Sequence, residues 1–324
     1  MTRKSGTRVR APSVGLAALT LGVSALLAAC GGGGSGGSTD GSGPGPTASS
    51  NGPATSGTDT QQAAPPTTPI VRTLASGVEL APTLDAPQPG STAITGDDKQ
   101  GIYIGDTSLA LISPAGRLMY KDFSRWIFGW LDISGASWIF QVPTVALSSV
   151  PNSNLEFITG SGIFVPKKLM DGNYFIDGGR ERTWGPLSYS SSNALAVQQK
   201  EMSGKWSTSS SSAGYDMSFE VDADGNLKGS TSGFLSGECS LSGTLLQTEP
   251  PTSHNMFNLK LTATNSATQS TDRACTLEQA EYDGLAAVFM NPVSAYPEEG
   301  AYRTLVFHAG SVTGGFLTNN LRRR

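Results

Sequence analysis

The chain of 324 residues has only two histidines that could act as a general base, His254 and His308. A hydrolase with a serine nucleophile would need one of them beside that serine. His254 follows two prolines, which indicates a loop, and His308 ends a short apolar run. We interpret each as an exposed or hydrogen-bonded residue at the end of a strand, and we therefore expect that the protein is not an enzyme.

Acidic pairs are the other candidates for acid–base chemistry. Glu298 with Glu299, and Glu278 with Glu281, could be imagined as the paired carboxylates of a glycosidase. The sequence gives no separation between them, so we interpret them as solvated surface acids. Two carboxylates facing each other across a cleft, or a strained serine beside either histidine, would change this interpretation.

Two short motifs match functional patterns without the context that those patterns need. Residues 222–226 (DADGN) carry calcium-type ligands, but the glycine comes too early for an EF-hand, and Gly233 stands where that loop has glutamate. An Asp-Gly pair between alternating segments predicts a hairpin turn instead. Residues 33–37 match G-x-S-x-G, yet a polyglycine run supplies neither the strand nor the helix of a nucleophile elbow. We expect no metal site and no cofactor.

The segment 123–140 is rich in large aromatic side chains. In a strand, Trp126, Phe128 and Trp130 would share one face, with Ile127 on the other. Such a face can pack as core. Alternatively, it can line the cavity of a barrel or form an exposed recognition patch. Trp126, Phe128 and Trp130 are therefore our candidate ligand-binding residues.

The N-terminus combines four basic residues with an apolar stretch, 14–29, that ends at Cys30. The stretch is shorter than the roughly 20 residues that a membrane-spanning helix needs. Its end, Leu27-Ala28-Ala29-Cys30 followed by Gly31, resembles the lipobox of bacterial lipoproteins. The resemblance implies that the signal peptide 1–29 is removed and that Cys30 carries the lipid. With Gly31 rather than aspartate after it, the resemblance also implies an anchor in the cell outer membrane, on either its periplasmic or its surface face.

Two further cysteines, Cys239 and Cys275, lie in strand-like segments. In an exported protein such a pair predicts a disulfide. It would close a loop of about 36 residues, worth about 3–4 kcal/mol in the chain-entropy model. The spacing contains no CxxC motif and does not suit a metal.

Composition divides the remainder of the chain. Residues 30–69 are mostly Gly, Ser, Thr and Pro with almost no apolar bulk, which predicts a disordered tether. Residues 70–95 mix apolar residues with prolines and are expected to form an irregular lead-in. Residues 96–324 remain for folding, which is enough for one all-β domain or two small ones.

The charge balance bears on the partners. The whole chain carries a formal charge of −4, and loss of the four basic signal residues leaves about −8. An acidic chain without a basic block argues against nucleic-acid binding. The three arginines 322–324 are interpreted as a solvated tail.

Strand signals dominate residues 96–324, because short β-branched and aromatic runs alternate with Gly, Asn, Asp and Pro. Met217, Phe219 and Val221, for example, would share one face. The candidate strands are 101–105, 107–113, 116–122, 125–132, 137–142, 155–159, 162–165, 173–177, 203–208, 215–221, 226–231, 238–246, 255–263, 284–289, 303–308 and 313–318. We expect an all-β fold, either an antiparallel meander barrel or a sandwich, with one large barrel or two small ones.

A weak internal sequence similarity divides the folding part into two halves, 96–200 and 201–324. Gly101-Ile102-Tyr103 opens the first and Gly204-Lys205-Trp206 opens the second. This Gly-x-aromatic opening is similar to the first strand of calycin-type barrels. The second half also resembles a recurrent pattern of uncharacterised proteobacterial lipoproteins, which includes the Gly-Lys-Trp strand, the Asp-x-Asp-Gly hairpin and the two cysteines.

Lipoproteins of similar build, including transferrin-binding-protein-like barrels, present loops or a cavity to a partner. The resemblance therefore implies an outer-membrane lipoprotein that binds a small ligand or a partner protein at the cell envelope. The alternative is a structural or assembly component of the envelope with a packed, ligand-free barrel. A filled interior would favour this alternative.

Overall fold

The computed structural model describes residues 74–148, 154–176, 179–208, 216–233, 236–267, 273–278, 281–296, 299–311 and 315–324. The expected signal peptide, Cys30, the tether, Gly33–Gly37 and Glu298 lie outside these residues. Within them, no helix is long and apolar enough to cross a membrane.

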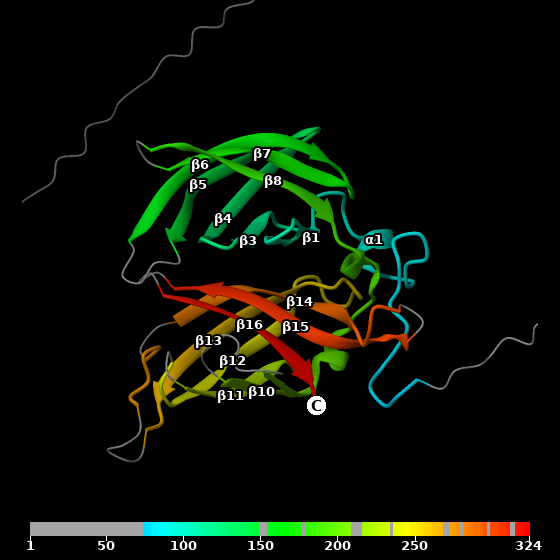
Figure 1. Ribbon diagram of the computed structural model, residues 1–324, viewed down its shortest axis with the longest axis vertical. Helices are drawn as coiled ribbons and strands as arrows, with labels where there is room; N and C mark the ends of the chain where they lie inside the picture. The colour runs from blue at the N-terminus through cyan, green and yellow to red at the C-terminus, as the bar shows by residue number, and fades with distance from the viewer. Residues whose placement is uncertain are drawn as a thin grey trace, which may run out of the picture. The chain divides into compact units, whose positions relative to one another are not determined.

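Eight antiparallel strands close the first barrel, here barrel 1 (Figure 1). Each strand pairs with the next, and the last pairs with the first. The strands are β1 (Gly101–Ile104), β2 (Leu109–Ile112), β3 (Arg117–Lys121), β4 (Arg125–Ser134), β5 (Ser137–Ser148), β6 (Leu155–Val165), β7 (Leu169–Ile176) and β8 (Glu181–Tyr189).

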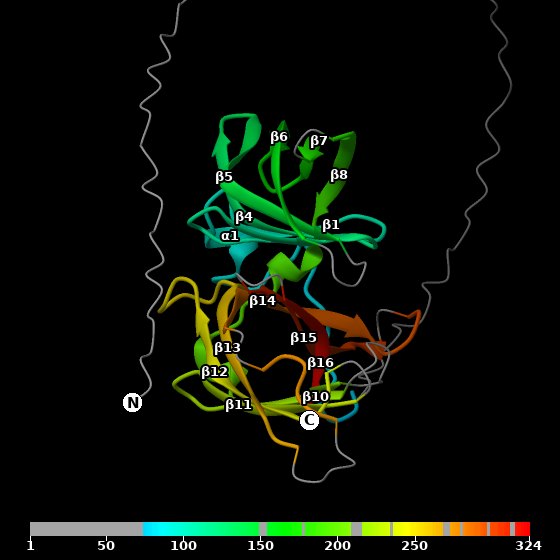
Figure 2. The same cartoon turned by 90° about the vertical axis from the view of Figure 1, so that its left-hand side faces the viewer.

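Eight more strands close a second barrel, barrel 2 (Figure 2). Its last strand pairs with its first. These strands are β9 (Gly204–Thr208), β10 (Asp216–Val221), β11 (Asn226–Ser232), β12 (Cys239–Gln247), β13 (Phe257–Asn265), β14 (Glu281–Pro292), β15 (Ala301–Gly310) and β16 (Phe316–Arg323). A short helix, α1 (Thr92–Thr95), precedes barrel 1. Two 3-10 turns, η1 (Ser191–Ala194) and η2 (Gln199–Met202), connect the barrels.

The predicted all-β fold is confirmed, in its form of two small barrels. The predicted strands were wrong at β6 and β8, and several others, including β5, β7 and β14, are longer than predicted. Segments 155–159 and 162–165 form one strand, β6, since Gly160 and Gly162 continue the ladder. Strand β8 was missed because Gly185-Pro186 reads as a break, whereas a register shift in β7–β8 accommodates it.

Each barrel is filled by the inward-facing half of its strand residues. Met217, Phe219 and Val221 are all buried in barrel 2, as their alternation predicts. In barrel 1, Trp138 is wholly buried and lies against Gly162. A Cβ at Gly162 would collide with the carbonyl of Asp171 and stand 2.7 Å from Trp138 Nε1, so only glycine leaves room for this indole.

The two barrels share a third, smaller apolar cluster. Outward-facing side chains of β1–β3 meet outward-facing side chains of β14 and the residue before β13. They are Ile102, Leu111, Met119, Met256, Leu285 and Ala287. Arg117 of β3 also pairs with Asp283 of β14 at 3.0 Å. Barrel 1 therefore uses one of its outer faces to bind barrel 2.

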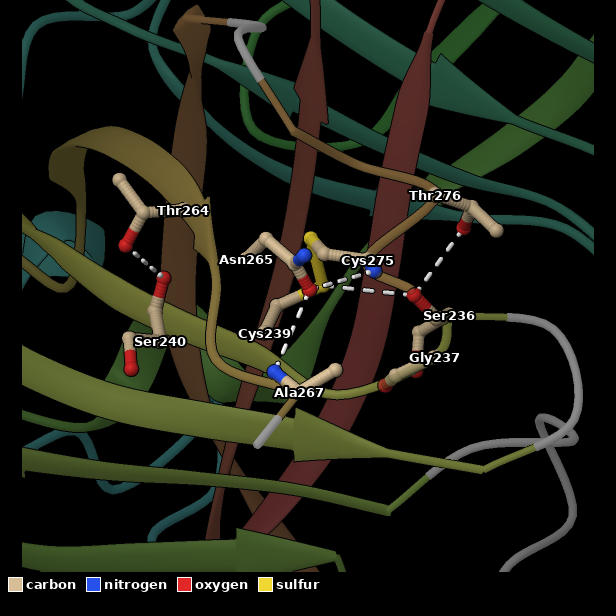
Figure 3. Close-up of a disulfide and its surroundings, with 9 residues drawn as sticks. All are labelled: Ser236, Gly237, Cys239, Ser240, Thr264, Asn265, Ala267, Cys275 and Thr276. Carbon is tan, nitrogen blue, oxygen red and sulfur yellow. Dashed lines mark hydrogen bonds between the residues drawn. A yellow bond between two sulfur atoms is a disulfide. The ribbon is translucent and has the colours of Figure 1, made fainter. Parts of the chain in front are cut away.

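The predicted disulfide between Cys239 and Cys275 is present in barrel 2 (Figure 3). It ties the start of β12 to the connection between β13 and β14. Asn265 Oδ1 accepts hydrogen bonds from the amides of Cys275, at 3.1 Å, and Ala267, at 3.3 Å, so the same connection is also held from the end of β13.

Candidate functional site

The three aromatic candidates of β4 lie on the outside of barrel 1. Trp126 stacks on Phe316 of barrel 2 with ring centroids 4.3 Å apart. Phe128 lies against Gly310 of barrel 2 and joins the shared apolar cluster. Trp130 remains 42% exposed. The interpretation that these residues line a barrel cavity was therefore wrong, because Ile127 and Leu131 occupy the inward positions. Their role in ligand binding stays a prediction.

A bulge in β5, opposite Gly129 of β4, separates Trp130 from the other two. The register of β4 with β5 shifts between Phe128 and Trp130. Gly129 leaves space there for Thr144, whose hydroxyl donates to the carbonyl of Gln141 at 2.5 Å and accepts from the amide of Trp130 at 3.3 Å. The aromatic face thus changes from barrel contact to open surface at this bulge.

Trp130 belongs to a wider apolar surface that continues over the next three strands. We call it the β6 face, because it centres on β6, and its side chains are between 39% and 57% exposed. Its members are Trp130, Ile139, Phe157, Ile163, Val165 and Phe175.

Strand register brings these side chains together in pairs on one outward face, with Thr159 and Ser161 of β6 between the pairs. Ile139 stands opposite Ser161, one outward position from Ile163. Phe175 stands opposite Thr159, one outward position from Phe157. Such diagonal neighbours are within reach of aromatic and long side chains. Exposed apolar side chains that gather on one face of a folded domain mark an interaction site more often than scattered single residues do.

Two carboxylates lie at the edge of the β6 face. Asp132 stands opposite Ile139, and Asp171 stands opposite Ile163. Within the described residues, neither carboxylate has a basic partner within ion-pairing distance. The face therefore combines apolar surface with unpaired negative charge.

A shallow hollow of about 430 Å³ opens at one end of barrel 1. Tyr120, Asp122 and Phe123 contribute to its lining, and Tyr120 donates a long hydrogen bond of 3.4 Å to Asp122. Burial, followed by the charge of Asp122, raises the pKa of Tyr120 well above its usual value. Tyr120 also packs against Trp184, and aromatic rings fill the interior, so the hollow stays at the rim.

His254 is buried and lies in a hydrogen-bonded chain of polar groups. Its Nδ1 lies 2.6 Å from Oε2 of Glu249, and its Nε2 lies 3.0 Å from the hydroxyl of Thr95 in α1. A threonine, a histidine and a carboxylate in this order match the arrangement of an activated nucleophile. However, the hydroxyl of Thr95 also lies 3.2 Å from the carbonyls of Gly90 and Ser91. Because a hydroxyl has one proton to donate, these carbonyls compete with the imidazole for it.

The position of this polar chain indicates a structural role. Thr95 belongs to the segment before barrel 1, whereas Glu249 and His254 belong to the loop between β12 and β13 of barrel 2. Gln100 donates to the same Glu249 oxygen at 3.1 Å. The sequence could not reveal this network, because Thr95 and His254 lie 159 positions apart.

His308 lies on the outward face of β15, turned toward barrel 1. It is 3% exposed, and its Nδ1 is 2.8 Å from the hydroxyl of Thr318. Desolvation by burial, and secondarily the charge of Lys121 in β3, lowers the pKa of His308 to about 3. The imidazole is therefore neutral near pH 7, and we assign it to packing between the barrels.

The remaining candidates have the roles that the sequence indicated. The carboxylates of Glu278, Glu281 and Glu299 are exposed. Asp222 accepts from the amides of Asp224 and Asn226, and the hydrogen bonds from Asn226 are the main cause that lowers its pKa. The Asp-Gly hairpin is thus confirmed. Among the described residues, no three acidic, histidine or cysteine side chains gather where they could hold a metal ion.

Comparison with known proteins finds no family model, curated protein or solved structure that matches this chain.

Proposed function

We propose that this protein is a lipid-anchored, non-enzymatic binding protein of the bacterial outer membrane that holds a partner protein on the β6 face. The lipobox pattern at Cys30 supports the anchor. The observation that carries the binding role is the gathering of exposed apolar side chains on one outward face, among them Ile139, Phe157 and Ile163.

A partner protein fits this geometry better than a small ligand inside a barrel. Both interiors are occupied by clusters of buried side chains. The hollow at the end of barrel 1 is shallow and has the exposed Phe123 in its rim. An outer sheet face, by contrast, offers the broad contact that protein interfaces use.

The chemistry of the β6 face defines the partner. Strand β4 already binds an apolar surface through Trp126 and Phe128, so the β6 face continues a face that has this capacity. Asp132 and Asp171 add negative charge at its edge. We infer a partner with an apolar surface flanked by lysine or arginine. The same acids oppose contact with an anionic lipid surface.

The binding role is tested by a double substitution, Ile139→Asp with Ile163→Asp. Both positions are exposed, and each new carboxylate stands opposite Asp132 or Asp171, at a cost of about 0.2–1 kcal/mol each. This cost is small enough that the fold persists while the apolar surface gains charge. Tagged protein is cross-linked in cells and isolated, and co-isolated proteins are quantified by mass spectrometry. We expect at least one envelope protein to fall about tenfold or more, the loss of about 1.4 kcal/mol or more in binding.

Leu246→Asp is the matched control, because Leu246 is an exposed apolar residue on β12 of barrel 2. It should leave the co-isolated proteins unchanged. Equal losses from both variants, or none from either, would contradict the role of the β6 face.

The anchor is tested by Cys30→Ser. The variant should leave the membrane fraction, because a thioether-linked lipid requires the cysteine sulfur. Complete retention with membranes would show that the lipobox interpretation is wrong.

A structural or assembly role in the envelope is the second candidate, and the filled interiors of both barrels favour it. It predicts that loss of the protein weakens the envelope. It also predicts that the double variant, Ile139→Asp with Ile163→Asp, restores the envelope to the same degree as the unaltered chain does. Failure of the double variant to restore it would favour partner binding.

A further inference from the structure

Four arginines gather around one hollow of about 530 Å³ at barrel 2. We call this the arginine hollow and define it by Arg303, Arg322, Arg323 and Arg324. Its wall includes Glu79 of the lead-in segment and Tyr302 of β15. The interpretation of residues 322–324 as a solvated tail was wrong for the first two, because Arg322 and Arg323 belong to β16 and pair with β9.

Arg303 is the structural arginine of the group. Its side chain is only 14% exposed, and it donates to both carboxylate oxygens of Glu79 and to Glu201 of η2. The backbone of Glu79 also pairs with Ala301 at 2.9 and 2.8 Å. Arg303 thus fixes the lead-in segment against β15, and its charge is already matched by carboxylates.

Among the described residues, the other three arginines form no such ion pair with a carboxylate. The guanidinium of Arg322 lies over the ring of Tyr302 at 4.0 Å. Arg323 donates to the carbonyl of Ser203, and Arg324 donates to the Ser207 hydroxyl and the Thr208 carbonyl. Within the described residues, no carboxylate lies within ion-pairing distance of these three guanidinium groups.

The resulting charge is unusual for this chain. The four arginines and the two glutamates leave a side-chain excess of two positive charges at the hollow, although the whole chain carries −4. Contacts to neutral groups hold these three guanidinium groups. Within the described residues, Arg323 uses one N–H group and Arg324 uses two, whereas a guanidinium has five to donate. Guanidinium groups that are held in place favour oxyanions that accept several hydrogen bonds at once, and preorganisation lowers the entropy lost on binding.

We propose that the arginine hollow is a binding site for a phosphate-bearing ligand. The volume lies within the range of small-molecule sites, which is roughly 300–1,000 Å³. Arg322 would provide the paired N–H groups, with Arg323 and Arg324 completing the charge. This site lies on barrel 2 and is independent of the partner-binding role of the β6 face.

Calorimetric titration of the purified chain with pyrophosphate tests the site. The substitution is Arg322→Gln, which removes one charge and keeps a polar side chain. The matched control is Arg182→Gln, because Arg182 is an exposed arginine of β8 in barrel 1. We expect saturable binding that Arg322→Gln weakens about tenfold or more and that Arg182→Gln leaves unchanged.

A second experiment distinguishes a free phosphate compound from a lipid headgroup. The chain, exported without a lipid anchor, is mixed with phosphatidylcholine vesicles that do or do not contain phosphatidylglycerol. Retention by the anionic vesicles alone, lost in Arg322→Gln and kept in Arg182→Gln, would support the site with a headgroup as its source. Pyrophosphate binding without vesicle retention would support it with a soluble source.

Two results would overturn the proposal. One is the absence of both vesicle retention and pyrophosphate binding tighter than about 1 mM. The other is an equal loss of binding in the Arg322→Gln and Arg182→Gln variants, because this would indicate attraction by overall charge rather than by a site.

Discussion

Barrel 1 and barrel 2 share one topology and differ in what they leave exposed. Eight large apolar side chains on the strands of barrel 1 are exposed, whereas among the described strand residues of barrel 2 only Leu246 is. Barrel 1 has register shifts in three of its strand pairs. The described pairs of barrel 2 run without one, and a disulfide ties β12 to the connection between β13 and β14.

This difference shows that closing a barrel constrains the residue types only at the inward-facing positions. The inner residues must fill the interior in both barrels, and they do. The outer residues are free to differ, and the bulge of β5 opposite Gly129 shows how β4 can contact barrel 2 at one end and face outward at the other. Before it, Trp126 and Phe128 hold barrel 2; after it, Trp130 faces outward at the edge of the β6 face.

The largest predicted difference concerns the disulfide. Replacing both Cys239 and Cys275 by serine should lower the stability of barrel 2 by about 3–4 kcal/mol, because the unfolded chain is no longer cross-linked. Hydrogen exchange measured by mass spectrometry would resolve the two barrels. We expect faster exchange in β12 and β13, with little change in β5–β7. An equal loss of protection in both barrels would show that they unfold as one unit.

Barrel 1 should be most sensitive at Gly162. Gly162→Val would place a side chain against the carbonyl of Asp171 and against Trp138, at a cost of about 3 kcal/mol. Tryptophan fluorescence during urea unfolding measures the effect. The control is Ser161→Val, an outward-facing neighbour, which should change stability by less than about 0.5 kcal/mol. Equal stability of the two variants would contradict the packing of Trp138.

The contact between the barrels should depend on pH through His308. Its folded-state pKa, about 3, lies below the unfolded value of 6.5, so the unfolded state binds the proton more readily. The contribution of His308 is complete above about pH 6.5 and is lost as the pH falls toward 3. At pH 5 the loss is about 2 kcal/mol relative to pH 7.

His308→Gln should reduce this pH dependence, because glutamine does not titrate in this range. Chemical denaturation at pH 5 and at pH 7 measures the difference for both proteins. If the free energy of unfolding falls equally between pH 7 and pH 5 in the variant, the pH dependence comes from carboxylates elsewhere. That result would contradict the buried, neutral imidazole.

The smallest effect on stability is expected at the β6 face. Ile163→Asp replaces an exposed side chain but places a carboxylate opposite Asp171, and it should lower the free energy of unfolding by about 1 kcal/mol or less. Thermal unfolding of the purified variant measures this. A loss of several kcal/mol would show that the residue supports the barrel rather than an external partner.

Local patterns account for what the sequence could predict. The alternation of Met217, Phe219 and Val221 indicates an inward face, and the two cysteines of an expected exported chain indicate their bond. Strand β8 was not predicted, because Gly185-Pro186 is typical of a turn. In the structure this dipeptide stays within the strand, where the register of β7 with β8 shifts.

Long-range placement could not be predicted. Trp126 and Phe128 do share a face, but that this face meets barrel 2 depends on residues almost 200 positions away. The arginine hollow requires residues of the lead-in, η2, β15 and β16 to meet. The polar chain from Glu249 through His254 to Thr95 likewise exists only after both barrels have formed.

The most direct test of partner binding by barrel 1 places a photoreactive amino acid at Ile163 of barrel 1 or at Leu246 of barrel 2, in living cells. Both positions are exposed and apolar, so they differ only in the face on which they lie. We predict a discrete cross-linked protein from position 163, lost when Ile139→Asp is added, and none from position 246. The same product from both positions, or no protein product from position 163, would contradict the claim that barrel 1 is the barrel that binds the partner.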